Sequence, residues 1–233
     1  MFRSFAWSLI LLYTIGISSC VKDDNNSTIS PLISVVHAVN DIPGFIQIQI
    51  SDSTIFREKV AFGQSVSPKS LPSGTHTITY FESVISNRLF ATSLNLEGGK
   101  NYTAFLCNSR LAPDHLIIEN NYSLKDSNNT SYRFVNMIPG ISLDVSISGN
   151  PTVYTLPFKN TSSSIENSTS SVAVLVRKTG STSALLTIPK LTGAKNKQYL
   201  IYFYGSSSSP QVNLFRLSKH ESMWSFIFLS RVC

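Results

Sequence analysis

One cysteine near the start of the chain has the neighbours that a lipid-attachment reaction needs. Residues 17–20 read Ile-Ser-Ser-Cys, which resembles a bacterial lipobox: a branched apolar residue, two small residues and a cysteine. Small side chains beside the scissile bond suit a signal peptidase, and the Cys20 thiolate is the nucleophile that would take the diacylglycerol. The apolar run at residues 5–17, preceded by Arg3, is shorter than the roughly 20 residues that span a bilayer, but it has the length of a signal-peptide core. We therefore predict a lipoprotein signal peptide at residues 1–19 and lipidation of Cys20.

The residues after this cysteine indicate where the anchored protein is sent. Lys22, Asp23 and Asp24 resemble the acidic export signal that follows the lipid cysteine in some Gram-negative bacteria, and Val21 replaces the Asp of the inner-membrane retention signal. Several acyl chains hold a protein durably, since each buried methylene contributes about 0.8 kcal/mol. We expect residues 20–31 to form a lipidated flexible tether. The predicted location is the outer membrane, lipid-anchored at the cell surface, with the periplasm-facing leaflet as the alternative.

The remaining titratable residues form no recognisable catalytic or metal-binding pattern. His37 aligns with Arg133 in an internal repeat described below, so we expect a half-exposed strand residue there. Asp114 and His115 are neighbours, but adjacent residues on a strand point to opposite faces. There is no Gly-x-Ser-x-Gly motif and no distinguished pair of carboxylates. We predict no catalytic residue, no metal and no cofactor.

Two cysteines remain besides Cys20, namely Cys107 and Cys233. They lie far apart and in different predicted domains, which favours a buried, unpaired Cys107 at a strand end. No Cys/His spacing matches a zinc site. We assign no role to Cys233.

The composition excludes one large class of partner. Charged residues make up 14% of the chain and the formal net charge is +6. The basic residues are scattered singly, whereas a nucleic-acid-binding protein clusters them on one face. We therefore expect no nucleic-acid partner.

An internal repeat predicts the domain organisation. Residues 39–44 (VNDIPG) return as residues 135–140 (VNMIPG), an offset of 96, and Ile46, Ile48 and Ile50 alternate with polar residues as residues 143–148 do. Apolar residues at every second position indicate strands with one buried face. Each Pro-Gly pair suits a type II turn. The chain therefore reads as all-β, with two tandem β-sandwich domains at residues 32–122 and 131–233.

Polar and apolar segments complete this division. The polar residues 123–130 form the predicted linker. Residues 160–171 are expected to be a long exposed loop within the second copy. The apolar residues 223–229 are expected to form a final buried strand.

The aromatic residues on the predicted strands have two possible roles. Tyr102 and Tyr199 each follow a glycine-containing turn, which favours a tyrosine corner, with the hydroxyl bonded to upstream backbone, over sugar stacking. Neighbouring aromatic residues on a strand alternate faces, so some rings should point outward and could face a ligand. The candidates for this role are Tyr80, Phe81, Tyr202 and Tyr204.

Both copies resemble the family known as domain of unknown function 4397. Residues 35–40 (VVHAVN) and 132–136 (YRFVN) are similar to the opening of that family, and the strand at residues 143–148 to its alternating strand. Residues 71–78 resemble its Gly-Thr strand start, although Ser170 stands in the second copy where Gly74 stands in the first. The resemblance implies immunoglobulin-like or transthyretin-like sandwiches on bacterial lipoproteins and carries no functional residues over.

These observations favour a non-enzymatic lipoprotein that presents loops and sheet faces to a glycan or an envelope protein. The first alternative is an envelope-anchored hydrolase with its site between the two domains. The second is a structural accessory of an envelope complex.

Overall fold

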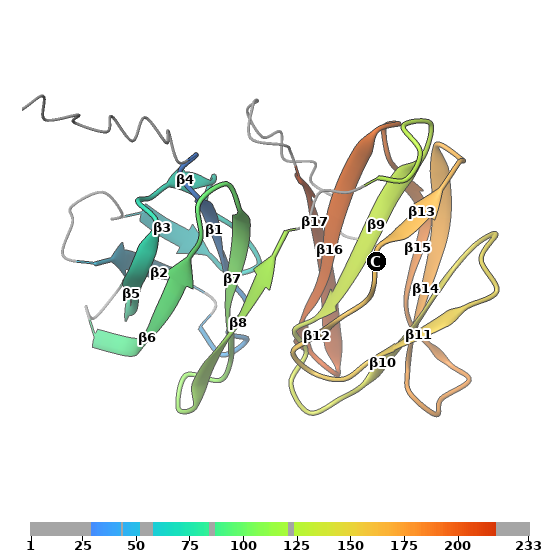
Figure 1. The fold of residues 1–233 in the computed structure, drawn as a ribbon. Coiled ribbons are helices and arrows are strands. Elements are labelled where there is room, and N and C mark those ends of the chain that lie inside the picture. The colour runs from blue at the N-terminus through green and yellow to red at the C-terminus, as the bar shows by residue number, and fades with distance from the viewer. Residues whose placement is uncertain (1–28, 43, 52–57, 84–86, 121–123, 218–233) are drawn as a thin grey trace, which may run out of the picture.

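The computed structural model describes residues 29–42, 44–51, 58–83, 87–120 and 124–217. Every regular element in these ranges is a β-strand, which confirms the all-β prediction (Figure 1). The strands form four sheets that pair into an N-terminal and a C-terminal sandwich. No helix in these ranges is long and apolar enough to cross a bilayer.

The N-terminal sandwich consists of an N-inner sheet, of order β4-β1-β7-β8, and an N-outer sheet, of order β3-β2-β5-β6. The neighbouring strands β1 and β7 run parallel, and all other neighbouring pairs in the two sheets are antiparallel. The strands are β1 (Leu32–His37), β2 (Phe45–Ile50), β3 (Glu58–Ala61), β4 (Lys69–Ser70), β5 (Gly74–Glu82), β6 (Asn87–Leu96), β7 (Asn101–Asn108) and β8 (Pro113–Glu119).

The C-terminal sandwich repeats this plan. Its C-inner sheet has the order β12-β9-β16-β17, with β13 also paired to β9, and its C-outer sheet has the order β11-β10-β14-β15. Strands β9 and β16 again run parallel. The strands are β9 (Thr130–Asn136), β10 (Leu143–Ile147), β11 (Val153–Leu156), β12 (Asn160–Thr161), β13 (Ile165–Asn167), β14 (Ser171–Lys178), β15 (Ala184–Thr192), β16 (Lys197–Ser206) and β17 (Ser209–Leu217).

The outer sheets have one buried and one solvent-facing side. In β2, Ile46, Ile48 and Ile50 lie in the N-terminal core, while Gln47 and Gln49 on the other face are half-buried. Strand β10 alternates in the same way. This confirms the period-two prediction for both strands.

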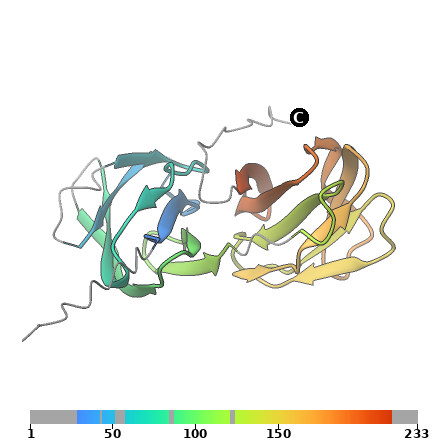
Figure 2. The ribbon, with the colours of Figure 1, turned by 45° about the horizontal axis from the view of Figure 1, so that its top comes forward.

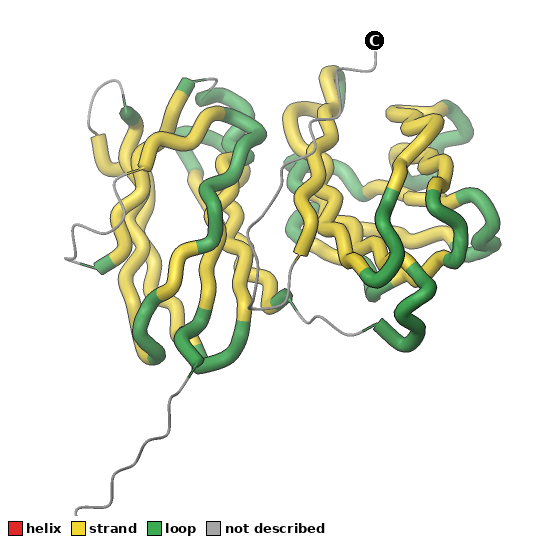
Figure 3. Tube along the Cα trace, turned by 90° about the horizontal axis from the view of Figure 1, so that it is seen from above, coloured by secondary structure: helices red, strands yellow, loops and turns green. Residues whose placement is uncertain are grey.

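The central strands of the inner sheets, β1 and β7 in one and β9 and β16 in the other, are buried on both sides. In β16, Tyr199, Ile201 and Phe203 point into the C-terminal core, whereas Tyr202 and Tyr204 join a third apolar cluster. That cluster also contains Phe105 and Cys107 of β7, on the face of the N-inner sheet opposite its core. The two inner sheets therefore pack against each other, with the outer sheets at the two ends of the molecule. Figures 2 and 3 show the sandwiches side by side.

In the first strand of each sandwich, the residues that are structurally equivalent are not the ones that the repeated sequence motif aligns. Tyr102 lies beside Ile33, and Tyr199, its counterpart 97 residues later, lies beside Tyr132. Ile33 and Tyr132 are therefore equivalent, an offset of 99 where the repeated VN-IPG motif has 96. His37 consequently matches Asn136, and its alignment with Arg133 is wrong.

Two further local predictions can be compared with the structure. Gly140 has a φ of +74°, as a type II turn requires, whereas the first-copy turn includes Pro43, which lies outside the described residues, and stays a prediction. The stretch at residues 160–171 is not simply a loop, because β12 and β13 within it pair with β9. Its first-copy counterpart contains β4, which pairs with β1 in the same way.

Residues at the edges of the predicted tether and linker form hydrogen bonds with the sandwiches. Within the predicted linker, the Lys125 N–H and the Asn129 side-chain amide donate hydrogen bonds to Glu166 at 2.8 and 3.1 Å. At the end of the predicted tether, the Ile29 carbonyl accepts a bond from the Gly99 N–H. The signal peptide at residues 1–19 and the predicted last strand at residues 223–229 lie outside the described residues, so these boundaries stay predictions.

Candidate functional site

The two corner tyrosines have the structural role that the sequence favours. The Tyr102 hydroxyl accepts a hydrogen bond from the Glu97 N–H at 3.2 Å, and the Tyr199 hydroxyl accepts one from the Ala194 N–H at 2.9 Å. Each bond reaches back five residues, and both rings are buried. This confirms the tyrosine corners and rules out sugar stacking on these two rings.

Three of the four rings predicted to face a ligand are buried. Tyr80 lies in the N-terminal core with 0% of its surface exposed, while Tyr202 at 1% and Tyr204 at 6% lie between the sandwiches. The prediction is wrong for these three because a second sheet or a second sandwich covers the face on which each ring stands. Phe81 differs, because it lies half-buried on the solvent side of the N-outer sheet.

His37 is fully buried, so the expectation of a half-exposed histidine is wrong. Its Nε2 lies 3.0 Å from the Ile42 carbonyl oxygen, and its Nδ1 accepts a bond from the Val39 N–H at 3.3 Å. Burial lowers the pKa of His37 to about 4, against the opposing effect of the bond to Ile42. The imidazole is therefore neutral and holds the turn after β1.

Asp114 and His115 point to opposite faces of β8, as expected for adjacent strand residues. The Asp114 carboxylate pairs with Lys159 of the other sandwich, whereas the His115 ring lies against Phe90 and Thr92 of its own sandwich. Burial pushes the pKa of Asp114 upward, but the bonds from Lys159 and the His115 N–H outweigh it and leave the pKa lowered. The carboxylate is not available to orient the imidazole.

Apolar side chains of the described residues pack between the two inner sheets. The interface cluster contains fully buried side chains from both inner sheets, and the Phe105 and Tyr202 rings meet at 5.4 Å in a T-shaped contact. Cys107 belongs to this cluster, where burial raises the pKa of its thiol to about 12. Cys107 is free and buried, which agrees with the prediction.

Polar contacts at the edges of this cluster tie the sandwiches together. Tyr202 and Asn213 both donate to the Gly63 carbonyl, at 2.8 and 2.9 Å. Lys159 and Asp114 form an ion pair across the interface at 2.5 Å. The backbone of Gly63 also passes so close to Tyr204 that a Cβ there would lie 2.3 Å from the ring.

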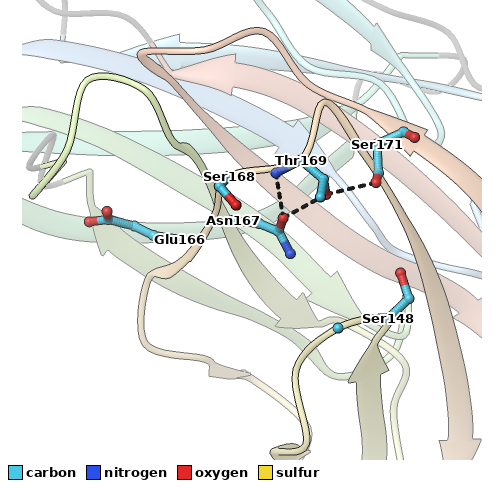
Figure 4. Close-up of a pocket in the computed structure, with 7 residues that line it drawn as sticks. Ser148, Glu166, Asn167, Ser168, Thr169 and Ser171 are labelled. Atoms are coloured by element: carbon cyan, nitrogen blue, oxygen red, sulfur yellow. Dashed lines mark hydrogen bonds between the residues drawn. The ribbon is translucent and has the colours of Figure 1, made fainter.

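A polar pocket of about 380 Å³ lies at one end of the C-terminal sandwich (Figure 4). Its walls are the turn after β10 and the segment from β13 to β14. The residues that line it are Ser148, Gly149, Glu166, Asn167, Ser168, Thr169 and Ser171.

Most of the polar groups in this pocket already bond to one another. Asn167 Oδ1 accepts from the Thr169 N–H at 2.8 Å and lies 2.6 Å from the Thr169 hydroxyl. The bonds from Lys125 and Asn129 lower the pKa of Glu166, so this carboxylate is ionised and holds the linker. The pocket can hydrogen-bond a polar ligand weakly, but it contains no base beside a nucleophile. The sequence showed only that this segment is hydrophilic.

The other predicted site residues lie outside the described part of the chain. Cys20 and the export residues Lys22, Asp23 and Asp24 fall in residues 1–28. Among the described residues, no group of three or more His, Cys, Asp and Glu side chains could hold a metal.

Comparison with a family model agrees with the topology. Residues 31–142 match the model of the domain of unknown function DUF4397. The chain contains a DUF4397 domain. The match spans the whole N-terminal sandwich and continues through β9 and the turn after it. For the rest of the C-terminal sandwich, the resemblance to DUF4397 remains a prediction that its matching strand order supports.

Comparisons with individual proteins add little to this. No curated protein matches the chain. A solved structure from Bacteroides fragilis, described as "a putative cell adhesion protein", aligns over 83% of this chain and 99% of that one, with 10% identity and a TM-score of 0.22. A similarity at that score supports no conclusion about this chain.

Proposed function

We propose that this DUF4397-containing chain is a non-enzymatic binding or adhesion module of the bacterial cell envelope, anchored by a lipid on Cys20. The observation that supports this best is the apolar packing of the two inner sheets. Interfaces between domains are usually polar enough to allow relative motion, whereas this one buries aromatic rings from both sides. The outer sheets and the loops are therefore the surfaces that we propose for a ligand. A glycan or an envelope protein is the partner that we propose.

The packing of the two inner sheets supports the hydrolase alternative less well than the binding module. The hydrolase site was expected between the sandwiches, where the apolar cluster now stands. We therefore propose no catalytic activity. An accessory role in an envelope complex would be revealed by a protein that co-purifies stably with the chain.

The anchor is tested by expressing the full chain and its Cys20→Ala variant in a Gram-negative host. We expect the wild type to incorporate labelled fatty acid, to fractionate with the outer membrane and to be digested by protease added to intact cells. The variant should lose the label and the membrane association. A wild-type protein that keeps its leader, or that is protected in intact cells, would contradict the anchor or the surface location respectively.

Binding is tested with the purified full chain on a glycan array and in pull-downs from envelope extracts. Retention of a glycan or an envelope protein at a defined ratio supports the proposal. Turnover of any retained glycan would contradict the non-enzymatic part of it.

A further inference from the structure

A row of four side chains crosses the solvent face of the N-outer sheet. The strand register places Lys59 of β3 opposite Gln47 of β2, Gln47 opposite Phe81 of β5, and Phe81 opposite Arg88 of β6. Directly paired residues in antiparallel strands stand on the same face, with Cβ atoms about 5 Å apart. At β6 a β-bulge leaves Leu89 unpaired between the Tyr80–Phe90 and Phe81–Arg88 pairs. Leu89 and Phe90 both pack against the core, which leaves the exposed Arg88 on the solvent face with Phe81. Three strand-to-strand spacings give the row a length of about 14 Å.

This row is accessible and positively charged. Lys59 and Arg88 at its two ends are exposed, and Phe81 and Gln47 between them are half-buried. Within the described residues, neither Lys59 nor Arg88 forms an ion pair.

The surroundings of the row are uncharged and partly apolar. On one side of Gln47, Phe45 of β2 stands on the same face, 51% exposed and opposite Ala61 of β3. The next row across β2, β5 and β6 consists of Gln49, Thr79 and Ala91. The described acidic residues of these strands are used elsewhere: Glu58 pairs with Lys69, and Glu82 pairs with Arg110. Among the described residues, Lys59 and Arg88 therefore have no acidic partner, and they stand on either side of the Phe81 ring.

The equivalent row in the C-outer sheet is different, so the fold itself does not require this pattern. It runs from Thr155 through Asp144 and Arg177 to Ala184. It has no aromatic ring, and the Asp144 carboxylate accepts bonds from Thr155 and Thr179 at 2.7 and 2.9 Å. The two copies share their inner faces but present different chemistry on their outer faces.

We propose that this row on the N-outer sheet binds an acidic glycan, a chain of sugars that bear carboxylate or sulfate groups; this rests on the proposed binding function. The negative face of the Phe81 ring attracts the C–H groups of a sugar ring. The Gln47 amide donates to and accepts from sugar hydroxyls. Lys59 and Arg88 bind acidic groups on sugars at either end of the row.

The spacing of the row favours a glycan over an acidic protein. Its cations are separated by an aromatic ring and an amide along one face of the sheet, which matches charges that recur along a chain of rings. A protein interface centres on an apolar core that is depleted of charge, whereas the Phe81 and Phe45 rings here lie among Lys59 and Arg88. The occupant that fits the charge and the polarity together is therefore an acidic polysaccharide.

The test measures binding of the purified full chain to polygalacturonate, heparin, neutral dextran and polyglutamate. We expect Lys59→Gln and Arg88→Gln each to weaken binding to an acidic polysaccharide about threefold to fivefold, as for exposed charge pairs. Phe81→Leu keeps the apolar volume, removes the ring and should weaken binding about fivefold. Arg177→Gln is the matched control, because it removes one cation from the equivalent row of the C-outer sheet. Urea unfolding of each variant verifies that it is folded.

The expected result is selective binding of polygalacturonate or heparin, weakened by the three N-outer variants and unchanged by Arg177→Gln. Equal losses in all four variants would show attraction to net charge alone and overturn the proposal. So would retention of polyglutamate that Phe81→Leu leaves unchanged, which would indicate an acidic protein. If the chain retains only neutral glycans or an envelope protein, this inference fails while the proposed binding function stands.

Discussion

His37 and Asn136 perform the same task with different side chains. Each ends the first strand of its sandwich and bonds to a backbone N–H two residues later and to a carbonyl five residues later. The Asn136 amide can do both at any pH, with its oxygen accepting from Ile138 and its nitrogen donating to Ile141. His37 can do so only when neutral, because Nδ1 must accept a bond from Val39.

We therefore expect His37 to make the stability of the protein depend on pH. Its pKa in the folded state, about 4, lies below the ordinary histidine value of 6.5. Between these values the unfolded chain binds a proton that the folded chain does not, so the free energy of unfolding falls as the pH falls. The slope is about 1.4 kcal/mol per pH unit for one proton. Urea unfolding from pH 7 to pH 4 measures it.

The variant His37→Asn places in the first sandwich the residue that the second already uses. It should fold and lose this part of the pH slope. Burial also lowers the pKa of His115, so a smaller slope in the same direction should remain. The matched control is His76→Asn, which changes a partly exposed histidine. A slope that is identical in the wild type and His37→Asn would contradict the role of His37.

At the scale of the element, each tyrosine corner fixes the turn that leads into the long central strand of an inner sheet. The bond made by Tyr199 is shorter than that of Tyr102, and Tyr199 as a residue is less exposed, 3% against 7%. We expect Tyr199→Phe to lower the free energy of unfolding by about 1–2 kcal/mol, because it leaves the Ala194 N–H without its acceptor. Tyr102→Phe should have a smaller effect. Urea unfolding followed by circular dichroism compares the two, and a larger loss in Tyr102→Phe would contradict this account.

The strands themselves could be predicted where local pattern decides them. Alternation identified β2 and β10, because one side of each faces a core and the other faces water. The strands β12 and β13 could not be predicted in this way, since a polar segment gains its edge pairing only from β9, which lies elsewhere in the sequence. The offset of 99 residues between equivalent positions of β1 and β9 could not be predicted either. The repeated VN-IPG motif begins after the end of β1 but inside β9, so aligning the motif misaligns these two strands.

Pairing between distant segments also explains what was missed in the candidate site. Phe81 was predicted to face a ligand, but Lys59 and Arg88 were seen only as single scattered charges. Only the register of β3, β2, β5 and β6 places them in one row. The burial of Tyr202 and Tyr204 had no local signal either, because the surface that covers them belongs to the other sandwich.

At the scale of the whole molecule, the two sandwiches associate much as the subunits of a two-fold dimer do. Equivalent positions meet at the centre, where Phe105 contacts Tyr202, its counterpart 97 residues later. Towards the edges, Gly63 lies against Tyr204. Lys159, the counterpart of Gly63 with a similar positive φ, pairs with Asp114, the strand neighbour of Cys107, and Cys107 is the counterpart of Tyr204. Such reciprocal contacts are the mark of an interface between like surfaces, and here they join two halves of one chain.

Gly63 is the residue on which this association can be tested. Its φ of +74° strains any other residue, and a Cβ would lie 2.3 Å from the Tyr204 ring. Gly180 has a φ of +80° and no atom within 4 Å of its Cβ position, so Gly180→Ala carries the backbone strain alone. We expect Gly63→Ala to reduce the free energy of unfolding by about 1–3 kcal/mol more than Gly180→Ala, which is the range for overpacking.

The same variant should also change the order of unfolding. Tyr204 and Tyr202 lie on one strand of the interface, so displacing one ring displaces the other, and the sandwiches should separate before either unfolds. Urea unfolding should then show two transitions in Gly63→Ala and one in Gly180→Ala, and small-angle scattering should give a larger radius of gyration for Gly63→Ala alone. Equal stability and a single transition in both variants would mean that the interface yields to the methyl group and does not hold the sandwiches as one body.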